Sequence, residues 1–136
     1  MNVARSGTTL VVIHAFLHGL HGLAHANIPV PLSLSQGIFI GVVILLAPIL
    51  AAILLWTKFV RIGSWLLLGS MTGAILFGIY NHFVVITPDH VTQVPFAGWG
   101  LLFQITAMLT LIVDGFGCWI SILVLKTTQR SKLILE

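Results

Sequence analysis

Long apolar runs separated by short polar breaks form the main pattern along this chain. Four runs are long enough to matter, and they cover residues 8–28, 37–56, 62–86 and 96–125. An α-helix needs roughly 20 apolar residues to cross a hydrocarbon core about 30 Å thick. Short connections place consecutive helices side by side in opposite directions. The pattern therefore predicts an all-α integral membrane protein, a single domain built as an antiparallel four-transmembrane-helix bundle.

Composition and charge support this prediction and orient the bundle. Of the 136 residues, 58% are hydrophobic and 7% are charged, whereas a soluble domain carries about 25% charged residues. All six basic residues fall on one side of the predicted bundle: Arg5, Lys58, Arg61, Lys126, Arg130 and Lys132. Because cytoplasmic loops attract Lys and Arg, we predict an N-in/C-in topology. The net charge of +3 then reflects topology in the lipid bilayer and not nucleic-acid binding.

Four histidines interrupt the first apolar run at helical spacing. His14, His18, His21 and His25 are separated by four, three and four residues, which places them on one narrow stripe of an α-helix. An imidazole without a partner is costly in hydrocarbon, so the stripe is predicted to face protein, water, a metal or a cofactor. Histidines spaced i, i+4 can hold one metal ion from one side. All four are candidate metal ligands.

Depth divides this stripe into an outer and an inner half. At about 1.5 Å per residue, His21 and His25 lie near the outer end of the first helix, level with His82 on the third. Asp89 and His90 follow in the loop directly above. Imidazoles with one carboxylate form a ligand set for zinc, copper or iron. We therefore predict a metal or cofactor site near the outer surface.

The inner half of the stripe faces the only acid in any predicted span. An ionised carboxylate in hydrocarbon requires a partner, and either His14 or His18 can provide one for Asp114. Gln104 and Met108 share a broad face of the last helix with Asp114. We expect these two residues to support Asp114 or to join it in a proton relay, and a nearby Met sulfur favours copper.

Heme b is one candidate cofactor, and copper or another transition metal is the alternative. A heme held by two histidines takes its ligands from opposite faces of the porphyrin, hence usually from different helices. His82 can oppose His21 or His25 in this way, and Gly19 and Gly22 would leave room for the macrocycle.

These patterns predict a small integral-membrane redox subunit that exchanges electrons with a quinone or a larger oxidoreductase complex. The sequence contains no nucleophile elbow, P-loop or dinucleotide-binding fingerprint, so the chain is not predicted to be an enzyme on its own. Two alternatives stay open. One is an accessory or assembly subunit without its own cofactor, in a larger complex or a homo-oligomer, and the other is a proton relay through His and Asp.

Overall fold

The computed structural model describes residues 3–133, with side chains to residue 127, and over this range the chain is helical with no strand. Four helical rods are long and apolar enough to cross a membrane. They are built from α1 (Val3–Asn27); from α2 (Leu34–Phe39), the π-helix η1 (Ile40–Leu46) and α3 (Ala47–Leu54); from α4 (Val60–Ile79) and the π-helix η2 (Tyr80–Val84); and from α5 (Gly98–Leu133). The predicted all-helical, membrane-spanning class is confirmed, although the first rod begins five residues before the predicted residue 8.

Local signals explain where the second and fourth rods begin. The Ser33 hydroxyl accepts a hydrogen bond from the Gln36 backbone N–H (3.2 Å), and the Gln36 side chain accepts one from the Ser33 N–H (2.8 Å). This capping box satisfies two amides that would otherwise lack partners at the helix start. Gly98 has a φ of +54°, a left-handed conformation that favours glycine, at the first residue of α5.

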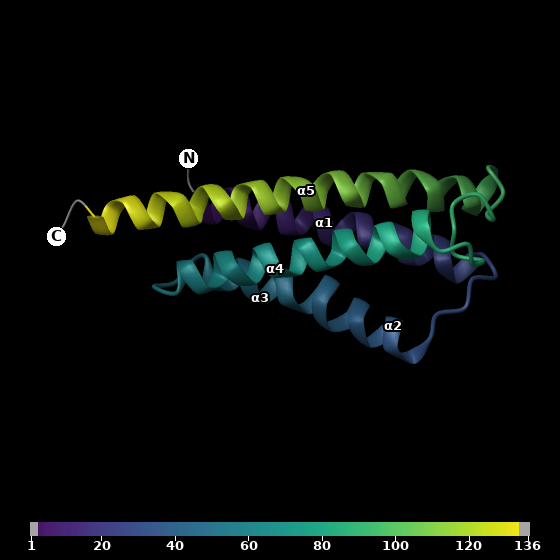
Figure 1. Ribbon diagram of the computed structural model, residues 1–136, viewed down its shortest axis with the longest axis horizontal. Coiled ribbons are helices and arrows are strands. Elements are labelled where there is room, and N and C mark those ends of the chain that lie inside the picture. Colours follow the sequence, from purple (N-terminus) through teal and green to yellow (C-terminus); the bar gives the residue numbers. More distant parts are fainter. Residues whose placement is uncertain (1–2, 134–136) are drawn as a thin grey trace.

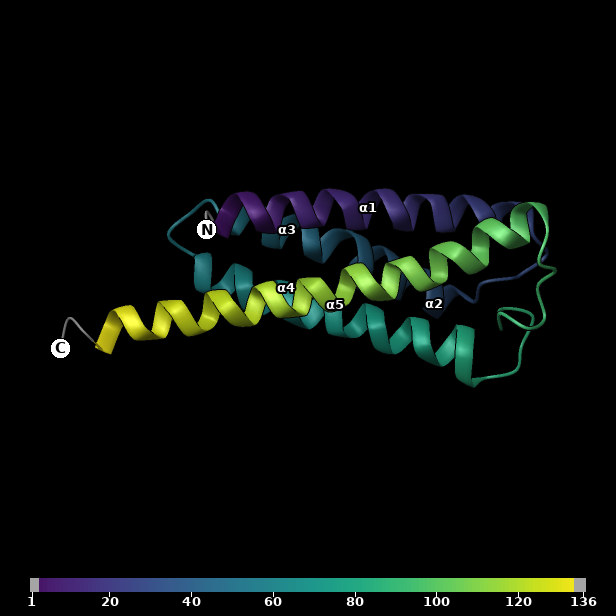
Figure 2. The same ribbon diagram turned by 90° about the horizontal axis from the view of Figure 1, so that it is seen from above.

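The rods lie alongside one another, and one of them is splayed. Figures 1 and 2 show that α1 and α4 begin, and α3 and α5 end, toward the same end of the molecule. α5 packs against both α1 and α4, while α3 packs against α4 and α1. Toward the opposite end, α2 diverges from the other helices (Figure 1). The divergence of α2 begins near the half of the molecule that holds His21 and His25.

Apolar packing is concentrated in the half of the molecule where α1 begins. Its buried members are Leu10, Val11, Ala51, Ala52, Leu55, Leu67 and Met71. A smaller cluster of Ala24, Val94 and Phe103 closes the opposite half. Close helix approach in the larger cluster depends on glycine, because a Cβ atom at Gly63 would lie 2.9 Å from the Leu54 Cβ and 3.0 Å from the Ala51 carbonyl oxygen. Small residues at helix contacts are a common way for helices to associate in lipid.

Pro48 perturbs the second rod just where that rod meets α1. Proline has no N–H, so it cannot bond the carbonyl four residues earlier, which belongs to Ile44. The residues immediately before it form the π-helix η1, in which the Ala47 N–H bonds the Val42 carbonyl. The Ile44 carbonyl oxygen instead lies 2.7 Å from the Nε2 atom of His14. The backbone irregularity and the first inner histidine are thus directly connected.

We expect Gly63→Ala to lower the free energy of unfolding by about 1–3 kcal/mol, because the new methyl group meets α3 backbone atoms that cannot move independently. Gly69→Ala on the same helix is the matched control, since a Cβ there meets no atom within 4 Å. Denaturation of both variants in detergent provides the comparison. Equal stability of the two would show that the α3–α4 contact does not require glycine.

Candidate metal centre

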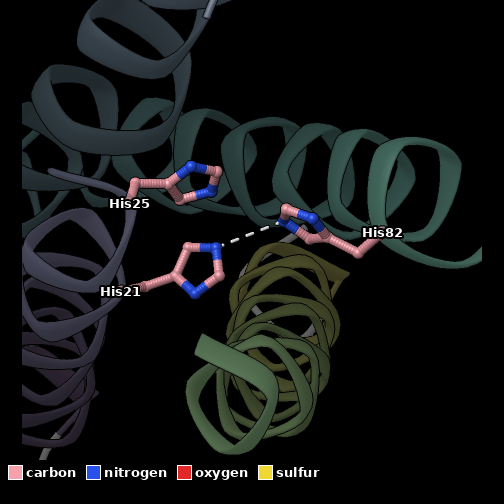
Figure 3. A group of neighbouring side chains, drawn as sticks. All are labelled: His21, His25 and His82. Atoms are coloured by element: carbon pink, nitrogen blue, oxygen red, sulfur yellow. Dashed lines mark hydrogen bonds between the residues drawn. The ribbon is translucent and has the colours of Figure 1, made fainter. Parts of the chain in front are cut away.

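Three imidazole rings converge toward the end of the molecule where α1 ends. His21 and His25 come from α1, His82 comes from η2, and all three rings point toward a common centre (Figure 3). One nitrogen of each ring lies within 4.8 Å of the others. The Nε2 atoms of His21 and His82 are 3.2 Å apart. Two segments separated by about 60 residues in sequence thus form one cluster, called the outer cluster below.

The hydrogen bond at the far nitrogen of His21 assigns its tautomer. The Thr106 hydroxyl lies 2.7 Å from the Leu102 carbonyl oxygen, to which it donates its only hydrogen. Its oxygen lies 2.9 Å from His21 Nδ1, so it accepts a hydrogen bond from that nitrogen. We therefore assign the ring proton of neutral His21 to Nδ1. The Nε2 lone pair then points into the cluster.

His82 is oriented in the same sense by the loop that follows η2. Its Nδ1 atom lies 3.1 Å from the backbone carbonyl oxygen of Asp89, which can only accept a hydrogen bond. The Val91 N–H in turn donates to the His82 carbonyl (2.9 Å), which folds the loop back over the helix end. Nδ1 of neutral His82 is therefore the protonated nitrogen, and its Nε2 also presents a lone pair to the cluster.

With both ring protons on Nδ1, the Nε2 lone pairs of His21 and His82 would face each other at 3.2 Å and repel unless a proton or metal cation lies between them. A proton on one Nε2 is the smallest such cation, and a metal ion is the other. Zinc–imidazole bonds of 2.0–2.1 Å in a tetrahedral site put two ligand nitrogens about 3.3 Å apart. The observed separation matches that value, and His25 supplies a third ring at the same point. Metal-bound histidines commonly donate their other N–H to a carbonyl, hydroxyl or carboxylate, as His21 and His82 do here.

Asp89 places a buried negative charge next to these rings. Its residue exposure is 6%, and its Oδ1 lies 3.3 Å from His25 Nε2 and 3.2 Å from His82 Nδ1. Neither nitrogen is aligned for a hydrogen bond to the carboxylate, and no other described residue provides one. A buried, unbonded carboxylate is costly. The negative charge of Asp89 therefore favours a cation in the outer cluster.

The inner cluster of His14, His18 and Asp114 is more fully hydrogen-bonded. His14 Nε2 donates to the Ile44 carbonyl (2.7 Å), and its Nδ1 lies 2.7 Å from Asp114 Oδ1. With Nε2 committed as a donor, the short contact to Asp114 holds one further proton shared between ring and carboxyl. His18 Nε2 lies 3.6 Å from the other carboxyl oxygen. The prediction that a stripe histidine partners Asp114 is confirmed, with His14 as the closer one.

The stripe is thus divided into two pairs. The rings of His14 and His18 are 4.3 Å apart and those of His21 and His25 are 4.8 Å apart between centroids. Among the ring contacts of the described residues, none joins His18 to His21. Each pair belongs to a separate cluster with its own acidic residue, as the estimate of depth predicted.

Three residues proposed from the sequence lie outside both clusters. His90 sits in a tight turn, where its Nδ1 bonds the Thr92 hydroxyl (2.8 Å). The Gln104 amide donates to the Val94 carbonyl (2.8 Å) and holds the loop instead of Asp114. Met108 is 53% exposed, because six residues at 100° each rotate it about 120° away from Asp114 on the helix.

Thr106 and the Ile44 carbonyl are functional groups that the sequence reasoning missed. Thr106, Thr110 and Asp114 are spaced i, i+4, i+8 on α5 and are all buried, so a polar stripe opposite the histidines was present in the sequence. The role of Ile44 could be inferred only from Pro48 four residues later, because a backbone carbonyl leaves no trace in composition.

A cavity of about 630 Å³ adjoins the outer cluster between α1, η1 and α4. Its α1 wall consists of small residues and histidines, namely Ala15, His18, Gly19, His21, Gly22, His25 and Ala26. Cβ atoms at Gly19 and Gly22 would meet no atom within 4 Å. The expected room beside these glycines is therefore present, and its size falls within the usual 300–1,000 Å³ range of small-molecule sites.

No protein-family model, curated protein or solved structure matches this chain. The functional conclusion therefore rests on the geometry of the two clusters and the cavity.

We expect Asp114→Leu to lower the free energy of unfolding by about 3–5 kcal/mol, because it leaves His14 Nδ1 buried without its partner. Asp114→Asn is the matched control. An amide N–H can donate to Nδ1 of neutral His14, so the loss should be near 1 kcal/mol. Thermal denaturation in detergent measures both. Similar losses for Leu and Asn would show that the hydrogen bond at His14 Nδ1 does not stabilise the fold.

Proposed function

We propose that this chain is a small integral-membrane redox protein that holds a transition-metal ion through His21, His25 and His82. The observation that carries the proposal is the 3.2 Å contact between the Nε2 atoms of His21 and His82, with the Nδ1 atom of each ring facing a hydrogen-bond acceptor. With both termini in the cytoplasm, as the basic residues predict, the ion would lie in the outer half of the membrane.

A bare ion fits the outer cluster better than heme b does. Ligands on opposite faces of a porphyrin are separated by two metal–nitrogen bonds, about 4.1 Å, with the macrocycle between them. The His21–His82 nitrogen separation of 3.2 Å is instead that of neighbouring ligands on one ion. Imidazole ligands suit copper, iron and zinc. Copper and iron are the two of these that can carry electrons, and we favour copper because Cu²⁺ is bound most tightly by a given site among the divalent first-row metals.

The cavity favours a reactive ion over a structural one. Structural metal sites are closed by four protein ligands, whereas catalytic sites hold three and keep one position open. The outer cluster offers three imidazoles, and the cavity of about 630 Å³ is lined by all three of these residues. The open position would face this cavity. A membrane-soluble molecule or a partner oxidoreductase could deliver electrons to the ion from there.

Metal binding by the purified, full-length chain tests this proposal. We expect one Cu²⁺ or Co²⁺ ion to bind per chain at the outer cluster. Because each variant loses a ligand, we expect His21→Ala or His82→Ala to weaken this binding at least 100-fold. His90→Ala is the control, because His90 bonds Thr92 and lies outside both clusters. Elemental analysis and titration with spectroscopic detection provide the measurement.

Other outcomes identify the competing functions. A strong Soret band that shifts on reduction would replace the bare ion by heme. Protein without bound iron or copper that fails to take up either ion would overturn the redox proposal, and stable co-purification with larger membrane proteins would then favour an accessory subunit.

A separate prediction concerns the tautomer of His21. Thr106→Val removes the acceptor for His21 Nδ1–H, so we expect the metal affinity to fall about 10–100-fold while the three ligands stay in place. Thr110→Val is the matched control. This threonine is also buried on α5, but its hydroxyl donates to the Ala107 carbonyl and forms no hydrogen bond with a histidine of the described residues. Equal affinities of the two variants would contradict the assigned tautomer.

A further inference from the structure

The cavity beside the outer cluster has apolar walls and three polar groups without hydrogen bonds. Ile40, Ile44, Leu45 and Phe77 line it across from the small residues of α1. His18, His25 and Asp89 also line it. His18 Nε2, His25 Nδ1 and both carboxylate oxygens of Asp89 are buried and lack a hydrogen-bond partner in the described part of the chain.

Unsatisfied polar atoms that share one cavity indicate a ligand with complementary groups. Leaving a buried donor or acceptor unbonded costs about 1–3 kcal/mol, and more for a charged group. Asp89, at 6% exposure, is the most demanding of the three because its carboxylate can only accept hydrogen bonds when ionised. The ligand must therefore present an O–H or N–H group to Asp89.

We propose that this cavity binds a membrane-soluble hydroquinone, with one hydroxyl donating to Asp89 beside His25 and the other bonding His18. The backbone positions of His18 and His25 are seven residues apart on α1, a rise of about 10.5 Å along the helix axis. A 1,4-dihydroxybenzene ring with an O–H hydrogen bond of about 2.7 Å at each end spans about 11 Å. The planar ring would lie against Gly19 and Gly22, where the helix surface is open.

The other apolar occupants of a membrane lack this set of groups. An acyl chain has no donor for Asp89, and an anionic phospholipid headgroup would be repelled by its carboxylate. An oxidised quinone carries only acceptors and cannot bond an ionised carboxylate. Since a hydrogen bond to a charged group is stronger than a neutral one, we expect the reduced form to bind at least 10-fold more tightly than the oxidised form.

Use of this hydroquinone as the electron donor rests on the proposed redox function, whereas its binding does not. The probe is a decyl-substituted ubiquinol, titrated anaerobically into the full chain in nanodiscs by calorimetry, with the oxidised form in parallel. Both titrations are run on metal-loaded and on chelator-treated protein. Binding without metal uptake would refute the metal centre alone, and metal uptake without binding would refute the cavity assignment alone.

A bulky side chain that fills the cavity tests whether ubiquinol binds there. We expect Gly22→Phe to weaken ubiquinol binding at least 10-fold, because its ring occupies the open space beside the cluster. Gly115→Phe is the matched control, since a Cβ there also meets no atom within 4 Å but the residue lies outside this cavity. Gly19→Leu tests the same wall if Gly22→Phe fails to fold.

Asp89→Asn tests the hydrogen bond that sets the preference. We expect this variant to lose the 10-fold preference for ubiquinol over ubiquinone, because a neutral amide serves both forms equally well. The proposal is overturned if wild-type protein binds neither form, if both forms bind it equally, or if Gly22→Phe and Gly115→Phe bind ubiquinol alike.

Discussion

The need to satisfy every polar group inside the protein governs this structure, because hydrocarbon offers none of the hydrogen bonds that water supplies. His14 of α1 shows how one side chain can satisfy polar groups on two other elements, η1 and α5. It joins the Asp114 carboxyl of α5 to the Ile44 carbonyl that Pro48 cannot bond in an α-helix. The polar layer is therefore a structural connection among α1, the second rod and α5, placed just beyond the apolar cluster of Leu10 and its neighbours.

The same requirement is met less completely about two helical turns beyond His14 along α1, at His21 and His25. In the inner cluster the short contacts of His14 occupy both of its nitrogens. In the outer cluster, Thr106 and the Asp89 backbone fix the far nitrogens of His21 and His82 and leave the near ones facing each other. With both ring protons on Nδ1, these two near nitrogens would repel each other at 3.2 Å. A cation at the cluster removes this repulsion, and the nearby Asp89 carboxylate balances the added charge.

Sequence reasoning succeeded where periodicity and hydrophobicity carry the information. Run lengths gave the four rods, and the 4, 3, 4 spacing with the rise per residue placed His21 and His25 at the level of His82. It failed where the direction of a side chain depends on its rotation about the helix axis or on the conformation of a loop. Met108 was assigned to the face of Asp114 although the two point about 120° apart, and His90 was grouped with Asp89 although a tight turn directs it to Thr92. Adjacent residues in a loop lie close together, but their side chains can point in different directions.

Both irregular helical segments lie where the clusters are built, and this placement has a physical basis. A π-helical turn widens the backbone and is frequent at functional sites. η1 contributes the Ile44 carbonyl, and η2 carries His82 at the point where the Val85 N–H bonds the Tyr80 carbonyl five residues back. In a regular α-helix each added residue turns a side chain by about 100°, so a wide turn changes the direction of His82 relative to the α4 face packed on α5. The two irregular segments thus lie beside the converging imidazoles and the adjoining cavity, while α1 remains regular and forms the cavity wall across from η1 and α4.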